Sequence, residues 1–147
     1  MDELNKSMRE CLANTFVMYF KAHAFHWNVE GINFPTYHEF FGNLYEELYS
    51  AVDPIAEQIR ALDAYAPAGL NEMYASAEIA DSNLKGDAVK QMLGALLSDN
   101  EKVLACLNES FKLANTADLQ GLADFIAGRI DTHKKHGWML RASMRGA

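Results

Sequence analysis

The stretch HWNVEGINFPTYH, residues 26–38, separates two long helical patterns and carries a histidine at each end. Gly31 is expected to close the first helix, which runs from about Glu3 to Val29. Pro35 suits the first turn of the second helix, where a missing N–H costs nothing. That helix is capped either by Thr36, in a Thr-x-x-Glu capping box, or by Asn33. The short turn predicts that His26 and His38 lie close together.

Apolar residues recur with helical spacing along four long segments. The stripe of the first segment consists of Leu4, Met8, Cys11, Leu12, Met18, Tyr19, Ala22 and Phe25. The second helix is predicted from Thr36 to about Leu62, the third from about Asp87 to Ala114, and the fourth from an N-cap at Thr116 to near Ser143. Each helix therefore has one face for a common core.

The connections between the helices indicate the topology. Asp63–Gly86 is a long crossover with one short helical piece near Leu70 to Tyr74, whereas the other two connections are short. One long crossover between helices two and three is typical of ferritin-like bundles. We expect a single all-α domain, residues 1–147, folded as a ferritin-like four-helix bundle whose crossover carries a short helix.

The second helix has two useful faces. One is an apolar stripe for the chain's own core, formed by Phe41, Leu44, Leu48, Val52, Ile55, Ile59 and Leu62. Roughly 130° away on the helical wheel lies a mixed aromatic and ionisable face, formed by His38, Gly42, Tyr45, Tyr49, Asp53, Glu57 and Arg60. The second face is expected to contact another subunit.

Two histidines and two carboxylates are the strongest candidates for a metal site. His38 and Asp53 are fifteen residues apart, which is roughly 22 Å along a helix axis, so one chain cannot close them around one metal. A two-fold dimer with these helices antiparallel brings the histidines of one chain to Asp53 and Glu57 of the other, twice. The Glu-x-x-His motif that holds two irons inside one bundle is absent at all five histidines.

Composition narrows the function classes. Thirteen Lys and Arg against twenty Asp and Glu give a net charge of −7, which attracts cations and repels nucleic acid phosphate. Cys11 and Cys106 lack the spacing of a zinc or redox pair and are interpreted as buried thiols. Without a charged-then-apolar leader or a membrane-length apolar run, the chain is expected to be cytoplasmic and without a membrane anchor.

These residues also match a known family. His26-Trp27-Asn28, then Gly31, Phe34 and His38, then Asp53-x-x-x-Glu57 followed by Arg60, resembles the Dps family, the mini-ferritins called DNA-binding proteins from starved cells. His136-Gly137-Trp138-Met139-Leu140 resembles that family's last helix, so the resemblance covers nearly the whole chain. It implies a hollow homododecamer that binds and oxidises Fe(II) at homodimer interfaces, usually with hydrogen peroxide, stores ferric mineral and protects against oxidative stress.

The resemblance implies that His26 and His38 of one chain and Asp53 and Glu57 of its partner are the ferroxidase ligands. Oxygen and imidazole donors suit Fe(II), and zinc could occupy the same site. Trp27 could supply an electron and quench radicals, although a large aromatic residue packing a helix end is the more frequent role. Taken singly, each histidine or carboxylate is more often a surface or core residue than a ligand. His23, His133 and His136 are predicted to be structural.

Two departures from the family pattern leave alternatives open. Gly42 stands where many members have an Asp, which puts a second iron position in question. Pro54 lies inside helix two and crowds the carbonyl of Ser50, which could shift Asp53. The alternative functions are a non-catalytic, shell-forming Dps-like oligomer and a DNA-compacting protein. Because the net charge is −7, tight DNA binding is not expected.

Overall fold

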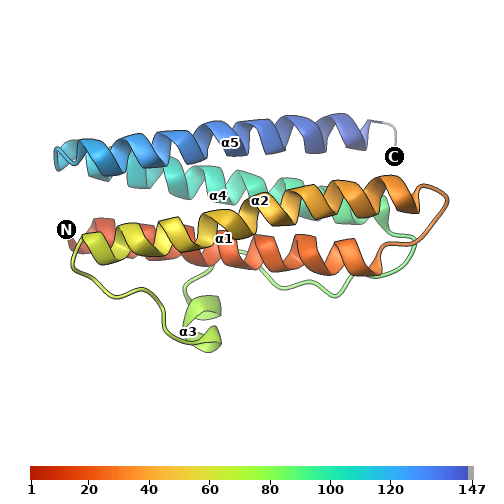
Figure 1. Ribbon diagram of the computed structural model, residues 1–147, viewed down its shortest axis with the longest axis horizontal. Coiled ribbons are helices and arrows are strands. Elements are labelled where there is room, and N and C mark those ends of the chain that lie inside the picture. The colour runs from red at the N-terminus through yellow and green to blue at the C-terminus, as the bar shows by residue number, and fades with distance from the viewer. Residues whose placement is uncertain (146–147) are drawn as a thin grey trace.

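Four long helices lie side by side in the computed structural model, which describes residues 1–145 (Figure 1). They are α1 (Asp2–Asn28), α2 (Phe34–Ala61), α4 (Val89–Thr116) and α5 (Gln120–Met144). A short helix, α3 (Leu70–Ala75), stands apart from the bundle on the connection between α2 and α4. The expected all-α four-helix bundle with a crossover that carries a short helix is therefore confirmed.

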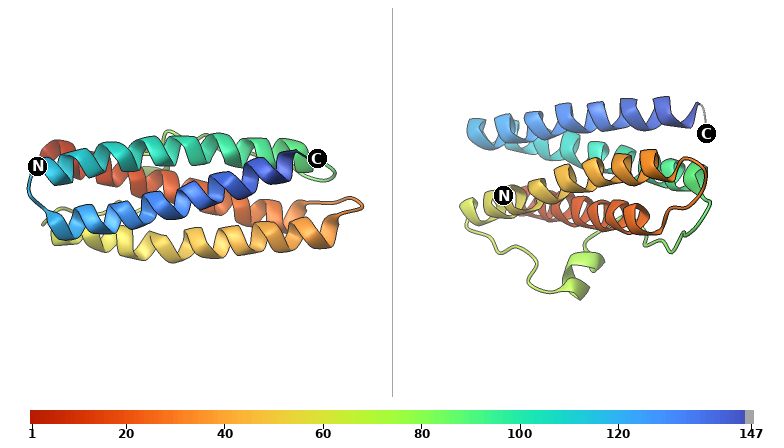
Figure 2. Two further views of the ribbon diagram at one scale, coloured as in Figure 1. Left: turned by 90° about the horizontal axis from the view of Figure 1, so that it is seen from above. Right: turned by 45° about the vertical axis from the view of Figure 1, so that its right-hand side comes forward.

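The ends of the crossover set the direction of the helices. Glu30 donates its backbone N–H to the carbonyl of Gly86 at 3.0 Å, and Gly86 donates its own to the carbonyl of Asn28 at 2.8 Å. These bonds place the start of α4 beside the end of α1, so α2 and α4 run in the same direction (Figure 2). The crossover must therefore travel the length of the bundle, as ferritin-like topology requires.

The core lies among the four long helices, with α1 packed on both α2 and α4, and α4 packed on α5. Most residues of the predicted stripes are buried, including Phe25 and Phe41, whose ring centroids are 5.8 Å apart. Other apolar residues of the four long helices and their ends are only half-buried against this core, namely Tyr19, Val52, Leu62, Val89, Phe111, Leu119 and Ile130. A search of residues 1–145 finds no helical segment suited to crossing a bilayer.

The helix starts decide between the predicted caps: for α2 the Asn33 alternative is confirmed, and for the last helix the predicted cap is wrong. Asn33 is the N-cap of α2 and Pro35 lies in its first turn, so the Thr36 capping box is wrong because Thr36 is already helical. Thr116 as the N-cap of the last helix is also wrong, because α4 continues through it and α5 is capped by Leu119. The chain reverses instead at Asp118, whose φ of 59° lies in the left-handed region that aspartate tolerates better than most residues.

Candidate metal centre

His26 and His38 meet at one end of the bundle, where the turn between α1 and α2 folds them together. Their rings are stacked, with centroids 3.8 Å apart and planes inclined by 15°. Nδ1 of His26 donates to the backbone carbonyl of His38 at 2.6 Å, and Nδ1 of His38 donates to the carbonyl of His26 at 2.7 Å. The predicted proximity of the two histidines is confirmed.

This pair of hydrogen bonds decides how the imidazoles can act. A carbonyl oxygen only accepts, so each Nδ1 carries a proton, and the lone pair of the neutral form of each ring is on Nε2. Metal-binding histidines generally have this arrangement, because a backbone acceptor on one nitrogen fixes the tautomer and the ring orientation. Both rings are therefore prepared to bind a cation through Nε2.

The carboxylates of Asp53 and Glu57 lie elsewhere on α2. Both side chains are exposed, and α2 is one continuous helix that includes Pro54, so the fifteen residues between His38 and Asp53 correspond to roughly 22 Å. Within residues 1–145 of one chain, no three His, Cys, Asp or Glu side chains gather as a metal site. The chain thus presents two separated pairs of candidate ligands and does not bring them together itself.

Gly42 lies directly against the histidine pair. A Cβ built at this position would be 3.1 Å from both Cε1 and Nδ1 of His26, which is closer than most real Cβ contacts. The absent side chain therefore leaves room for the His26 ring to reach the His38 carbonyl. The sequence indicated only that a family carboxylate was missing here, because the contact requires knowing how α1 and α2 pack.

A cluster of aromatic residues borders the histidine pair. His23 stacks on Tyr45 with centroids 3.7 Å apart, and its Nδ1 is hydrogen-bonded to the Tyr19 hydroxyl at 3.0 Å. Partial burial, together with nearby His26, lowers the pKa of His23. Trp27 is 55% exposed and its ring lies 4.2 Å from that of His23, so this tryptophan does not fill the core of its own chain.

A second polar cluster, around Glu47, was missed by sequence reasoning. Arg129 contacts both carboxylate oxygens of Glu47, at 2.5 and 3.2 Å, and Nε2 of His136 donates to the same carboxylate at 2.6 Å. Partial burial raises the pKa of Glu47, but the hydrogen bonds from His136 and Arg129 outweigh it and lower the pKa to about 2. A Glu-x-x-His spacing within one helix is the usual sequence sign of a bundle site. Here Glu47 lies on α2 and its partners Arg129 and His136 lie on α5, so no local spacing indicates the cluster.

His133 completes the Glu47 cluster. Its Nδ1 donates to Asn100 Oδ1 at 2.7 Å, and its Nε2 accepts from Arg129 at 3.0 Å. Burial, followed by the nearby Arg129 charge, lowers the pKa of His133 to about 3, so the ring is neutral. His133 and His136 bind protein side chains, in line with their predicted structural role. The Arg129 guanidinium is a fixed cation at this carboxylate, which leaves no vacancy there for a metal.

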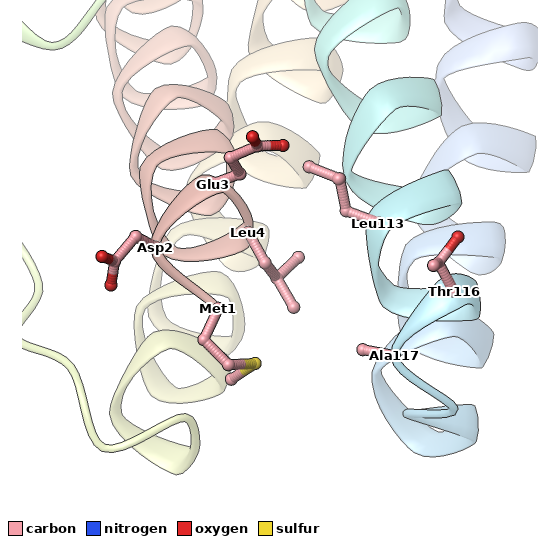
Figure 3. A pocket seen from close by; sticks show the side chains of 7 residues that line it. All are labelled: Met1, Asp2, Glu3, Leu4, Leu113, Thr116 and Ala117. Atoms are coloured by element: carbon pink, nitrogen blue, oxygen red, sulfur yellow. The ribbon is translucent and has the colours of Figure 1, made fainter.

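Two hollows in the surface of residues 1–145 lie away from the histidine pair. One, of about 520 Å³, lies between the first turn of α1 and the end of α4, at the opposite end of α1 from His26. Leu4 and Leu113 face one another across it, whereas the Asp2 carboxylate points away (Figure 3). Another, of about 450 Å³, lies between α2 and α5 beside Glu47 and His136. The first is lined by the carboxylates of Asp2 and Glu3 but by no imidazole or thiol, so it lacks the imidazole donors of the histidine pair.

Comparison with known sequences gives consistent matches. The sequence model of the ferritin-like domain family matches residues 5–145. DNA protection during starvation protein 2 of Bacillus anthracis is 34% identical over 143 residues, covering 95% of this chain and 97% of that protein. DNA protection during starvation protein of Brevibacillus brevis is 33% identical over 131 residues, covering 89% of this chain and 87% of its own.

Solved structures show the same similarity in three dimensions. The antigen TpF1 of Treponema pallidum superposes with a TM-score of 0.92 at 29% identity, covering 97% of this chain and 92% of the other. A Dps protein from Bacillus brevis superposes with a TM-score of 0.90 at 29% identity, covering 97% and 95% of the two chains. Sequence and fold thus agree over almost the whole length of the described chain.

Proposed function

This chain belongs to the ferritin-like family, as one of its Dps proteins, and on that premise we propose that it oxidises Fe(II) at sites shared between two subunits and stores the ferric product. The family itself supports iron storage and protection. The ligands proposed are His26 and His38 from one subunit and Asp53 and Glu57 from its partner. The mutual hydrogen bonds of His26 and His38 carry the proposal, because they leave Nε2 of both rings available to iron.

Sharing between chains is argued from distance and exposure. Asp53 and Glu57 point to solvent in the single chain and lie far along α2 from His38. They are four residues apart, so they share one helix face and can hold a cation together. A two-fold axis that pairs two α2 helices antiparallel forms two complete sites from four half-sites. Twelve such subunits in a hollow homododecamer are the assembly that the Dps resemblance implies.

The proposed reaction consumes Fe(II) and hydrogen peroxide as substrates. Two ferrous ions each give one electron to one peroxide molecule, the O–O bond breaks, and two protons complete two molecules of water. Carboxylate oxygens favour the ferric product, while neutral imidazoles raise the affinity for Fe(II). Delivery of both electrons at one site avoids releasing a hydroxyl radical, which makes the chemistry protective.

Trp27 has a secondary role in this proposal. Its ring lies 4.2 Å from that of His23, and Trp27 is next in sequence to His26, so it is the residue proposed to supply an electron when only one ferrous ion is present. Zinc, which accepts the same donor types but has no redox chemistry, would act at the site as a competitor of iron. A Trp27→Phe variant should therefore oxidise Fe(II) at the normal rate but accumulate more protein oxidation when peroxide exceeds iron.

The rival function is a shell-forming oligomer without efficient iron chemistry. Gly42 favours it, since the position provides no carboxylate for a second iron. The first experiment is therefore anaerobic loading of the metal-free protein with Fe(II), followed by peroxide, with ferric formation recorded in the near ultraviolet. We expect oxidation well above the protein-free rate. A rate equal to that of buffer would leave the shell-forming oligomer as the better account.

A mixing experiment tests whether the site is shared between chains. One variant carries His26→Ala with His38→Ala, and the other carries Asp53→Ala with Glu57→Ala. Each alone should be inactive, but co-assembly of equal amounts should restore about a quarter of the wild-type rate, because half of the dimers then contain one intact site of two. Glu101→Ala, an exposed carboxylate of α4, is the matched control and should remain fully active. No recovery on mixing would rule out sharing between chains.

A further inference from the structure

Cys11 of α1 and Cys106 of α4 meet inside the bundle, far from the histidine pair. Their Sγ atoms are 2.7 Å apart although the residues are 95 positions apart in the sequence. The sequence predicted two buried thiols, and both are buried, but it gave no indication that they touch. The contact depends on the register between α1 and α4, which a single sequence does not reveal.

The separation of the two sulfur atoms is only about 0.7 Å longer than a disulfide bond of ~2.05 Å. We propose that Cys11 and Cys106 form an oxidisable dithiol that closes to a disulfide between α1 and α4 when the protein meets hydrogen peroxide. This inference does not depend on iron binding. It assigns the protein a second site of reaction with oxidant, located between two helices of one chain.

The surroundings of the dithiol can accommodate the bond without losing a required partner. Cys106 Sγ donates to the backbone carbonyl of Ser7 at 3.4 Å, and Cys11 Sγ donates to Cys106 Sγ. The Ser7 carbonyl lies inside α1, where the N–H four residues later remains its donor after the thiol proton is gone. Ser7 and Ser110 also keep their own hydrogen bond of 2.5 Å between hydroxyl oxygens.

Ser110 supports the oxidised state as well. Its Oγ lies 3.3 Å from Cys11 Sγ, and a hydroxyl can donate to a disulfide sulfur as it can to a thiol. Oxidation therefore removes two S–H donors and leaves every neighbouring acceptor with a donor. The pair has no third ligand for a metal, because no group of three His, Cys, Asp or Glu side chains forms in residues 1–145.

Oxidant would reach the pair from the Cys106 side. Cys106 is 8% exposed, whereas Cys11 is fully buried. In the first step the Cys106 sulfur attacks one peroxide oxygen, the O–O bond breaks, and a sulfenic acid and one water are formed. In the second step Cys11 sulfur displaces that hydroxyl group as a second water. Two thiols and one hydrogen peroxide thus give one disulfide and two waters.

The reaction should be slow at neutral pH. The hydrogen bond with Cys11, burial, and the nearby charges of Cys11, Glu10 and Glu78 all raise the pKa of Cys106, and the thiolate is the reacting form. We expect the rate of disulfide formation to increase with pH. The disulfide is therefore expected to form during sustained exposure to oxidant and not during brief exposure.

The test uses the full-length, iron-free oligomer, with a chelator present, exposed to hydrogen peroxide and separately to diamide. The expected result is loss of both free thiols, a mass lower by two hydrogen atoms, and a proteolytic peptide that joins Cys11 to Cys106. Thermal unfolding of the oxidised protein should shift upward by about 10 °C, since the bond closes a long loop, and a reductant should reverse the shift.

Cys11→Ser is the matched control, because it keeps a small polar side chain beside Ser110. In this variant oxidant should give neither the joined peptide nor the thermal shift. Three results would overturn the proposal in the wild type: both thiols surviving either oxidant at alkaline pH, oxidation beyond sulfenic acid without a joined peptide, or disulfides that link separate subunits on a non-reducing gel. All three results are read from the wild-type protein, so none of them depends on whether the Cys11→Ser variant folds.

Discussion

The two candidate iron-binding histidines hold one another through backbone atoms. Each Nδ1 donates to the carbonyl of the other residue, so replacement of one side chain leaves the acceptor of the other in place. His38→Ala therefore removes a proposed ligand and a stacking partner but not the hydrogen bond that orients His26. Loss of activity in single variants can then be assigned to the missing imidazole instead of to collapse of the turn.

Gly42 is the residue through which this orientation can be disturbed. A Gly42→Ala variant places a Cβ 3.1 Å from the His26 ring, so the ring must move by a few tenths of an ångström or more. We expect Fe(II) oxidation to slow by about tenfold, because small displacements of reacting groups have large effects on rate. The measurement is the initial rate of ferric formation after addition of peroxide.

The matched control for this change is Gly128→Ala in α5, where a Cβ would meet nothing within 4 Å. It should keep the wild-type rate and raise the free energy of unfolding by up to ~1 kcal/mol, as alanine does in helices. If Gly42→Ala oxidises Fe(II) as fast as Gly128→Ala, the position of the His26 ring does not limit the reaction. That result would contradict the proposal that His26 is an iron ligand.

The Glu47 cluster predicts how stability depends on pH. Burial holds the pKa of His133 at about 3 in the fold, against 6.5 in an ordinary histidine. Below pH 6.5 His133 therefore binds a proton in the unfolded chain but not in the native protein. The free energy of unfolding falls as the pH is lowered from 6.5 to about 3. Glu47, with a pKa of about 2 against 4.5, adds a second loss between those values.

His133→Gln separates these two contributions. Glutamine does not titrate, and its amide can donate toward Asn100 and accept from Arg129. The free energy of unfolding, measured by denaturant at a series of pH values, should decline less between pH 6.5 and 4.5 than in the wild type, while the part of the loss below pH 4.5 that Glu47 contributes remains. If the free energy of unfolding declines between pH 6.5 and 4.5 as steeply in His133→Gln as in the wild type, His133 is not the group that causes this decline.

At the scale of elements, the end of the crossover supports the turn that carries the histidines. Gly86 forms backbone hydrogen bonds to both Asn28 and Glu30, and its φ of 79° suits glycine. A Gly86→Ala variant should lose about 1 kcal/mol of unfolding free energy through left-handed strain. Amide exchange at Glu30 should become faster, because its acceptor is the strained residue.

Gly69→Ala is the control in the same crossover. It lies at the start of α3 with a φ of −139° and no atom within 4 Å of a built Cβ, so neither strain nor a clash is introduced. Its stability and amide exchange near Glu30 should match the wild type. Equal effects of the two substitutions would mean that the crossover responds to general loss of flexibility and not to the conformation of Gly86.

The helices were largely predictable because their apolar spacing is local information. The crossover, with α3 at Leu70–Ala75, and the meeting of His26 with His38 followed from turn residues and spacing. The predicted N-cap at Thr116 was wrong because the chain reverses two residues later, at Asp118, which takes the left-handed conformation. The Cys11–Cys106 contact and the Glu47 cluster required the register between distant helices, which periodicity alone does not contain.

At the scale of the whole molecule, the single chain leaves many large side chains uncovered. The exposed aromatic residues near or on the second face of α2 include Trp27 at 55% and Tyr49 at 60%. On that face Asp53 and Glu57 are exposed, whereas His38 is half-buried against His26 of the same chain. Aromatic residues beside separated ligand pairs are what an interface between subunits requires, and the same interface would complete the iron sites.

The net charge predicts that the protein does not bind DNA. One chain carries −7, and each further copy in the proposed shell would add to the repulsion of phosphate. We expect no retardation of duplex DNA in a gel shift at low salt, where electrostatic binding is strongest. The same chain with a Lys-rich extension fused to its N-terminus is the positive control and should retard DNA in a salt-sensitive manner. A salt-sensitive shift by the unmodified protein would contradict the charge argument and would restore DNA compaction as a function, whereas its absence leaves protection to the iron chemistry alone.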